Sequence, residues 1–183
     1  MRLSLPCRSL LCAALALALA ACTPALDWRE VRSEEGGYAI LMPARPATAS
    51  RAIDLDGLAV VMTMTGAEVD GVAFAVGTAE LPNATAARQA LTTMQQALVR
   101  NMQGIVTADR TLAVPRGTQG GAMVVREIHA NGPASAATNG QSRVMRVRLT
   151  AVEHRVYQIL ISGPAQRIDD DMATIYFSSF RVN

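Results

Sequence analysis

The chain of 183 residues contains no lysine, and all seventeen of its basic residues are arginines. A phosphate-binding P-loop, a Schiff-base enzyme and a Ser-x-x-Lys hydrolase each need a lysine amine, so these three classes are excluded. Histidine is also scarce, with two copies, and aromatic side chains make up 4% of the chain. Aliphatic side chains and methionine must therefore supply most of the core.

Cysteine occurs three times, at Cys7, Cys12 and Cys22, and nowhere beyond residue 22. Residues 23–183 therefore contain neither a thiol nor a disulfide. Cysteine nucleophiles, zinc–thiolate centres and iron–sulfur ligation are excluded from this part of the chain. We expect no cofactor.

An excess of positive charge is also absent beyond the first 22 residues. Subtracting Arg2 and Arg8 from the seventeen arginines leaves fifteen, against fifteen Asp and Glu residues, none of which lies in that segment. The formal net charge of +2 thus belongs to the N-terminal segment. A neutral domain gives no basis for strong attraction to nucleic acid, and we expect no such partner.

The N-terminal segment has an unbroken apolar run, residues 10–21, behind Arg2 and Arg8. Twelve residues span roughly 18 Å as a helix, well short of a hydrocarbon core of about 30 Å. This pattern is typical of a signal peptide rather than of a membrane span. Leu19-Ala-Ala-Cys22 resembles the bacterial lipobox, whose cysteine becomes the first residue and is lipidated. The alternative is an ordinary secretory signal with an incidental cysteine.

The resemblance to bacterial lipoproteins implies a signal peptide over residues 1–21 and a lipid anchor on Cys22. Two or three acyl chains hold a protein durably on a membrane, whereas one chain does so only marginally. Residues 22–27 would then be a lipidated tether, and residues 28–183 a single domain facing the periplasm. In this family Asp after the cysteine favours inner-membrane retention, so Thr23 favours the outer membrane over the inner one.

Two Asp-Gly pairs mark the start of the domain. Asp56-Gly57 lies between the β-prone residues 52–55 and 58–65, and Asp70-Gly71 lies between two further runs of this kind. Asp-Gly in such a context is typical of a type I′ turn, because both central residues need φ > 0. Two of these turns in succession predict a three-stranded antiparallel meander.

Hydrophobic periodicity then predicts a helix that Asn83 caps and Gly104 stops. A tight turn is expected at Glu153-His154, and Pro164 is expected to open a closing helix. That helix would carry, along one side, Ile168, Met172, Ile175 and Tyr176. The remaining expected strands are 38–42, 104–107, 110–114, 122–130, 142–152 and 155–162. Because tight turns join most strands, the predicted class is α+β: an antiparallel β-sheet of a meander and hairpins, with helices packed on its faces.

Two short stretches carry a further resemblance. Residues 36–46, Gly-Gly-Tyr-Ala-Ile-Leu-Met-Pro-Ala-Arg-Pro, and residues 178–182, Ser-Ser-Phe-Arg-Val, resemble the opening and the ending of PsbP-like domains. This superfamily includes the DcrB-type envelope lipoproteins and a Ran-binding nuclear-import factor. The resemblance implies an antiparallel sheet sandwiched by helices and an accessory or binding role. Its members share no catalytic residue, so no active site is carried over.

Candidate chemistry centres on the two histidines. If His129 and His154 meet at one end of the sheet, they could share a metal or form a hydrolase centre with Glu127 or Glu153. No spacing pre-orients these groups, so exposed polar residues at the ends of elements are the alternative.

Two other motifs suggest ligand sites but have simpler explanations. Met62 and Met64 share a strand face, which suits Cu(I), but apolar neighbours on the same face favour core packing. Residues 117–121 are rich in glycine but lead into a strand rather than a helix, so we expect a hairpin turn instead of a phosphate site.

Two surfaces are candidates for binding a partner. A turn at residues 153–154 places Arg146 and Arg148 on an apolar sheet face. This face either packs under the closing helix or binds a ligand. In the first case the Asp169–Asp171 cluster of the helix would meet the arginine heads. The second surface is the loop at residues 131–141, a run of small residues beside a strand end. The candidate partner-binding residues are His129, Asn131, Asn139, Arg146 and Arg148.

The sequence thus favours a non-enzymatic, lipid-anchored protein of the bacterial cell envelope that acts as an accessory or binding module. Its partners would be the membrane, through the anchor, and an envelope protein, lipid or glycan. The alternatives are a hydrolase built on His129 and His154 with Glu127 and Glu153, and a periplasmic metal-binding protein.

Overall fold

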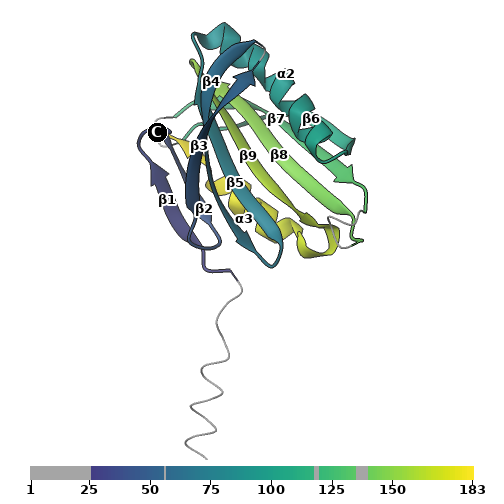
Figure 1. Ribbon diagram of the computed structural model, residues 1–183. Helices are drawn as coiled ribbons and strands as arrows, with labels where there is room; N and C mark the ends of the chain where they lie inside the picture. The colour runs from purple at the N-terminus through teal and green to yellow at the C-terminus, as the bar shows by residue number, and fades with distance from the viewer. Residues whose placement is uncertain (1–25, 56, 118–119, 135–139) are drawn as a thin grey trace, which may run out of the picture.

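The computed structural model describes residues 26–55, 57–117, 120–134 and 140–183 (Figure 1). The strands in these residues are β1 (Arg29–Ser33), β2 (Tyr38–Met42), β3 (Ala47–Leu55), β4 (Leu58–Val69), β5 (Val72–Glu80), β6 (Ile105–Pro115), β7 (Ala122–Gly132), β8 (Arg143–Val152), β9 (Arg155–Pro164) and β10 (Arg181–Val182). The helices are α2 (Ala84–Asn101), α3 (Asp170–Ser179) and a short 3₁₀ turn, η2 (Ala165–Arg167). The expected signal peptide and Cys22 lie outside the described residues.

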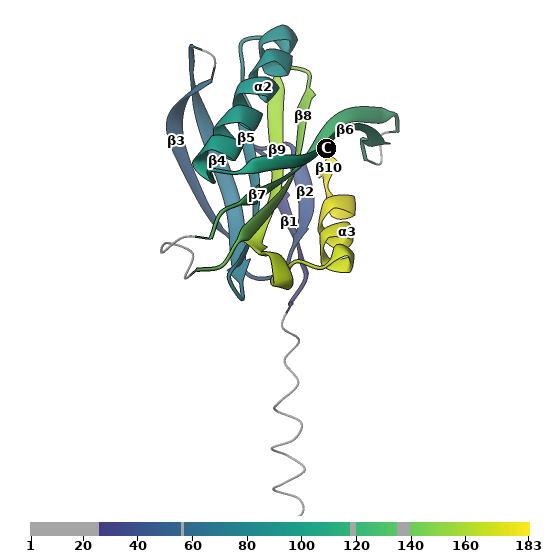
Figure 2. The same ribbon diagram turned by 90° about the vertical axis from the view of Figure 1, so that its right-hand side faces the viewer.

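A seven-stranded antiparallel sheet, in the order β3-β4-β5-β9-β8-β7-β6, is the centre of the fold. Helix α2 packs on one of its faces. Helix α3 and a three-stranded sheet, β1-β2-β10, pack on the other face. Figure 2 shows the two helices on opposite sides of the large sheet. This arrangement confirms the predicted α+β class, with an antiparallel sheet between helices.

Both predicted Asp-Gly hairpins are present. β3 and β4 pair so that Ile53 lies opposite Val60, and Gly57 in the turn between them has φ +80°. In the β4–β5 turn, Asp70 and Gly71 have φ +51° and +76°, as a type I′ turn requires. These two turns set the register of the three-stranded meander.

Asn83 caps α2 as expected, because its side-chain oxygen accepts the backbone N–H groups of Thr85 and Ala86 at 3.0 and 2.9 Å. The helix ends at Asn101, before the predicted stop at Gly104. Gln103, rather than Gly104, adopts the left-handed conformation that stops it, with φ +50°.

Two predicted elements are corrected by the structure. Residues 104–107 and 110–114 are not separate strands but parts of β6, which continues through a bulge between Val106 and Ala108. No glycine or proline lies between the two runs, so nothing breaks the strand, and Asp109 within it binds Arg126 on β7 at 2.7 Å.

The closing helix also begins later than Pro164, which is the last residue of β9. Asp169 caps α3, because its carboxylate accepts the backbone N–H of Met172 at 2.6 Å. Ile168 therefore precedes the helix, and Ile175 is 42% exposed rather than on its buried side. Met172 and Tyr176 are buried as expected.

The start of the domain and its smaller strands extend beyond the prediction. Leu26, two residues before the expected start at Trp28, already packs against the core, and Asp27 donates its N–H to the carbonyl of Pro43. β1 and β10 were not expected. β10 pairs with β2 so that Val182 lies opposite Tyr38, which brings together the two stretches that resemble PsbP-like domains.

The two faces of the large sheet differ in chemistry. The α2 face is filled by aliphatic and methionine side chains, among them Met62, Met94 and Met145. The opposite face holds every aromatic side chain of the protein: Trp28, Tyr38, Phe74, Tyr157, Tyr176, Phe177 and Phe180. The rings of Phe74 and Tyr176 pack edge to face, with their centroids 5.3 Å apart. Such ring contacts stabilise the layer beyond the burial of its apolar surface.

The described residues include no helix that is both long enough and apolar enough to span a bilayer.

Candidate functional site

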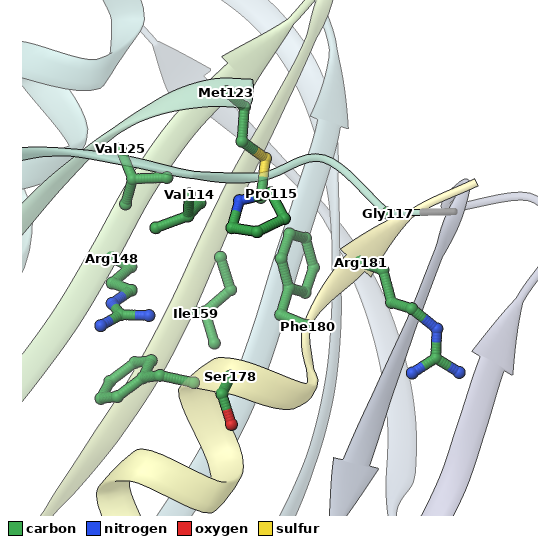
Figure 3. A pocket seen from close by; sticks show the side chains of 11 residues that line it. Val114, Pro115, Gly117, Met123, Val125, Arg148, Ile159, Ser178, Phe180 and Arg181 are labelled. Atoms are coloured by element: carbon green, nitrogen blue, oxygen red, sulfur yellow. The ribbon is translucent and has the colours of Figure 1, made fainter. Parts of the chain in front are cut away.

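A cavity of about 400 Å³ lies between α3 and the strands β6, β7 and β9 (Figure 3). The residues around it are Val114, Pro115, Gly117, Met123, Val125, Arg148, Ile159, Phe177, Ser178, Phe180 and Arg181. Most of these side chains are apolar, and in Figure 3 the side chain of Arg181 extends away from the others. Arg148 is therefore the arginine whose charged group lies next to the apolar side chains of the cavity.

The far end of the β6–β7 hairpin closes the cavity against the C-terminal strand. The backbone N–H of Val182 donates to the carbonyl of Arg116 at 3.0 Å. Gly117 lies so close that a Cβ atom there would be 2.8 Å from the carbonyl oxygen of Val182, and its φ is +139°. Both the contact and the backbone conformation require glycine. The hairpin thus forms one wall of the cavity, and α3 forms the opposite wall.

Arg148 lies at the boundary between the apolar cavity and a polar pocket. Its guanidinium carbon is 4.8 Å from the centroid of the Phe177 ring, which is within the range of a cation–π contact. Three residues, Arg148, Phe177 and Ser178, line both the cavity and the neighbouring pocket of about 520 Å³. The two hollows therefore adjoin at these side chains, and together we call them the cleft beside α3, apolar at one end and charged at the other.

The polar end of the cleft is organised around Glu127 on β7. Strand pairing places Arg110 of β6 and Arg148 of β8 directly on either side of it. Arg110 donates to its carboxylate at 3.0 Å and Arg148 at 2.7 Å, while the Glu127 side chain is only 8% exposed. Burial raises the pKa of Glu127, but the hydrogen bond and charge of Arg148, with the charges of Arg110 and His129, outweigh it and hold the pKa below its ordinary value.

His129 lies two residues further along the same strand, with its Nε2 atom 3.5 Å from the Glu127 carboxylate. Burial lowers the pKa of His129, the charge of Glu127 opposes this effect, and the charges of Arg146 and Arg110 add to the decrease. The pKa falls below the ordinary value of 6.5, so the ring is neutral at pH 7.

Arg146 completes this end of the cleft. Its guanidinium binds the carboxylate of Asp170 at 2.6 Å, which links β8 to the first turn of α3. The prediction that the closing helix covers the arginine face, with its Asp cluster meeting the arginine heads, is confirmed for this pair. The tight turn predicted at Glu153-His154 is also confirmed, because Val152 at the end of β8 pairs with Arg155 at the start of β9.

The structure separates the two histidines. His129 lies opposite Arg146, eight residues from His154 along β8 and its turn, which corresponds to about 25 Å of strand. His154 lies 3.9 Å from Glu80, and Glu153 lies 3.6 Å from Arg116. The alternative in which both histidines meet at one end of the sheet with Glu127 or Glu153 is therefore wrong.

The other candidate sites have structural explanations. Met62 and Met64 belong to the core beneath α2, as the packing interpretation predicted. Arg116 donates its backbone N–H to Gly121, so the glycine-rich segment is part of a hairpin. Within the described residues, no three His, Cys, Asp or Glu side chains lie close enough together to hold a metal ion.

The loop at residues 131–141 is only partly described. Asn131 belongs to β7 and lies opposite Val144, where it is exposed. Asn139 lies outside the described residues. Of the candidate partner-binding residues, the structure thus brings together His129, Arg146 and Arg148, and it places Asn131 on the same strand as His129.

Sequence reasoning missed Arg110 and the apolar cavity. Arg110 is separated from Glu127 by seventeen residues, and only the register of the β6–β7 hairpin shows that they are paired. The alternation of Arg146 and Arg148 with apolar residues was a usable signal for the face on which the cleft lies. Comparison of the sequence with models of known protein families and with curated proteins gave no match.

Proposed function

We propose that this protein is a lipid-anchored binding protein of the bacterial cell envelope, and that it holds the apolar part of its ligand in the cavity beside α3 without chemical conversion. The observation that carries the proposal is a cavity of about 400 Å³ with a mostly apolar lining and the guanidinium of Arg148 at one end. This volume lies within the range of small-molecule sites, which are mostly apolar with a few placed polar groups.

Among the three partner classes that the sequence left open, the cavity favours a lipid. A glycan would place many hydroxyl groups against Val125, Ile159 and other apolar side chains, where they would lack hydrogen-bond partners. An acyl chain makes no such demand and gains from burial of its methylene groups. The wall formed by Phe177 and Phe180 is part of the aromatic layer, so close packing supports this side of the cavity.

The anchor and the location are parts of the same proposal. The lipobox-like Leu19-Ala-Ala-Cys22 supports lipidation of Cys22, and Thr23 supports the outer membrane over the inner membrane. A protein held at a membrane surface by its own acyl chains works where lipid ligands are present. The PsbP-like stretches support an accessory or binding role rather than an enzymatic one.

Titration of the purified domain with a dansyl-labelled fatty acid tests the proposal. Ser178 is exposed on α3 at the rim of the cavity, so Ser178→Trp places a large side chain over it with little effect on the core. Ile175→Trp, on the same helix and exposed but not lining the cavity, is the matched control.

We expect saturable binding that Ser178→Trp weakens at least tenfold and that Ile175→Trp leaves within twofold. Equal binding by both variants and the unmodified domain would place the probe elsewhere. Absence of saturable binding by a well-folded domain would refute the proposal.

A further inference from the structure

We propose that the polar end of the cleft is an anion site formed by Arg146, Arg148 and Arg110, so that the ligand is an acyl-chain anion whose chain occupies the cavity. This inference rests on the proposed function and adds the chemistry of the head group. That head group is a phosphate or a carboxylate, the two anions that guanidinium groups bind with paired hydrogen bonds.

The first support is the balance of charge. The polar pocket is lined by three arginines and two carboxylates, with His129 neutral at pH 7. One positive charge therefore remains without a counter-charge inside the pocket. A monoanionic head group supplies that charge and meets donors that the fold has already placed.

The second support is the unequal exposure of the partners. The side chain of Asp170 is 87% exposed, whereas that of Arg146 is 25% exposed. An exposed carboxylate contributes little to an ion pair, because water solvates it equally well when the pair is broken. A ligand anion can therefore displace Asp170 from Arg146 at small cost, while the half-buried guanidinium gains a partner in its less hydrated surroundings.

The third support is that the two hollows adjoin each other. Arg148, Phe177 and Ser178 line both the apolar cavity and the arginine pocket. A chain that enters the cavity past Phe177 leaves its polar end beside Arg148. The cation–π contact between these two residues keeps the guanidinium at that boundary.

Glu127 is the internal counter-charge of the site and sets its strength. It is nearly buried between Arg110 and Arg148 and reduces the positive potential that a ligand head group meets. Replacement of this carboxylate by a neutral amide of the same shape therefore increases the attraction for an anion. A site that binds only through apolar contact would not respond in this way.

The test compares three displacing ligands with the same chain: dodecyl phosphate, dodecanoate and the neutral dodecyl maltoside. Arg146→Gln removes one guanidinium from the pocket. Arg126→Gln is the matched control, because Arg126 lies on the opposite sheet face, is also paired with an aspartate, and its replacement changes the net charge equally.

We expect Arg146→Gln to weaken both anionic ligands at least fivefold and to leave the neutral ligand within twofold, while Arg126→Gln changes none of them by more than twofold. Glu127→Gln should strengthen the anionic ligands at least threefold. The anion that the unmodified domain binds more tightly, phosphate or carboxylate, identifies the source of the head group.

Three results would overturn the inference: equal affinity for the neutral and anionic ligands, equal effects of Arg146→Gln and Arg126→Gln, or weaker anion binding by Glu127→Gln. The first of these would leave the proposed function standing, because the neutral chain would still bind in the cavity. Failure of all three ligands to bind would refute the proposed function itself.

Discussion

The carboxylate of Glu127 is expected to stabilise the fold as well as to weaken anion binding in the cleft. Glu127→Gln tests both effects, and the free energy of unfolding reports the first. The change keeps the shape of the side chain and removes its charge. Glu127 accepts hydrogen bonds from Arg148, which is 22% exposed, and from Arg110, which is 57% exposed. Arg110 regains hydration when it loses its partner, so its loss contributes little.

The magnitude follows mainly from Arg148. A hydrogen bond between charged groups contributes about 1.5–3 kcal/mol, and a glutamine oxygen replaces only part of it. We therefore expect the free energy of unfolding to fall by about 1–2 kcal/mol at pH 7, or the melting temperature to fall by roughly 2–8 °C for a domain of this size. Urea unfolding of both proteins measures the difference.

The difference should depend on pH with a defined sign. The pKa of Glu127 is lowered in the folded state, so its stabilisation is complete above the unfolded value of about 4.5 and is lost as the pH falls through the lower folded value. His129 is present in both proteins, so its titration largely cancels when their free energies of unfolding are subtracted. The difference between them should therefore persist from pH 7 to pH 5 and shrink below about pH 4.5.

Asp109→Asn is the matched control for this measurement. Asp109 binds Arg126 on the same pair of strands but on the opposite face, and its side chain is 33% exposed. We expect it to lose less than about 1 kcal/mol, as exposed ion pairs do. A loss below about 0.5 kcal/mol for Glu127→Gln, or a loss that does not change between pH 7 and pH 3.5, would refute the reasoning.

Three further predictions concern the turns and the anchor. Gly57→Val should lower the free energy of unfolding by about 1 kcal/mol or more, because a β-branched residue resists the φ of +80° found there; an unchanged urea midpoint would contradict this. Gly117→Val should detach the β6–β7 hairpin from β10 and expose amide hydrogens near Val182 to exchange, and unchanged exchange there would show that the contact is not needed to close the cavity. Cys22→Ser should abolish lipidation and membrane retention while the purified domain keeps its melting temperature, as detergent phase partitioning and the mass of the N-terminal peptide would show; an unmodified Cys22 in the native protein would refute the anchor.

Local signals in the sequence predicted the antiparallel meander, α2 and the β8–β9 hairpin. The Asp-Gly pairs need φ > 0 and so specify their turns, and Asn83 specifies a helix start. The prediction of the closing helix at Pro164 was wrong because a proline can equally end a strand, whereas Asp169 supplies the capping oxygen that begins α3.

The site was predicted only in part. Alternation placed Arg146 and Arg148 on one apolar face, and the turn at residues 153–154 fixed their register against β9. The contact of Arg110 with Glu127 depends on the register of the long β6–β7 hairpin, which no local sequence signal specifies. The prediction failed for the histidine pair because His129 on β7 lies opposite Arg146, near the start of β8, whereas His154 lies in the turn beyond the other end of β8.

Photo-crosslinking with a diazirine-bearing fatty acid tests the central claim most directly. A second apolar groove, between the end of α2 and strands β8 and β9, offers the probe an alternative that includes Leu98 and Met102. We predict crosslinks on α3 around Phe177 and on β7 around Val125, both removed by excess dodecyl phosphate. Crosslinks confined to the α2 groove, or spread over the surface and insensitive to the competitor, would contradict the claim that the cleft beside α3 binds an acyl-chain anion.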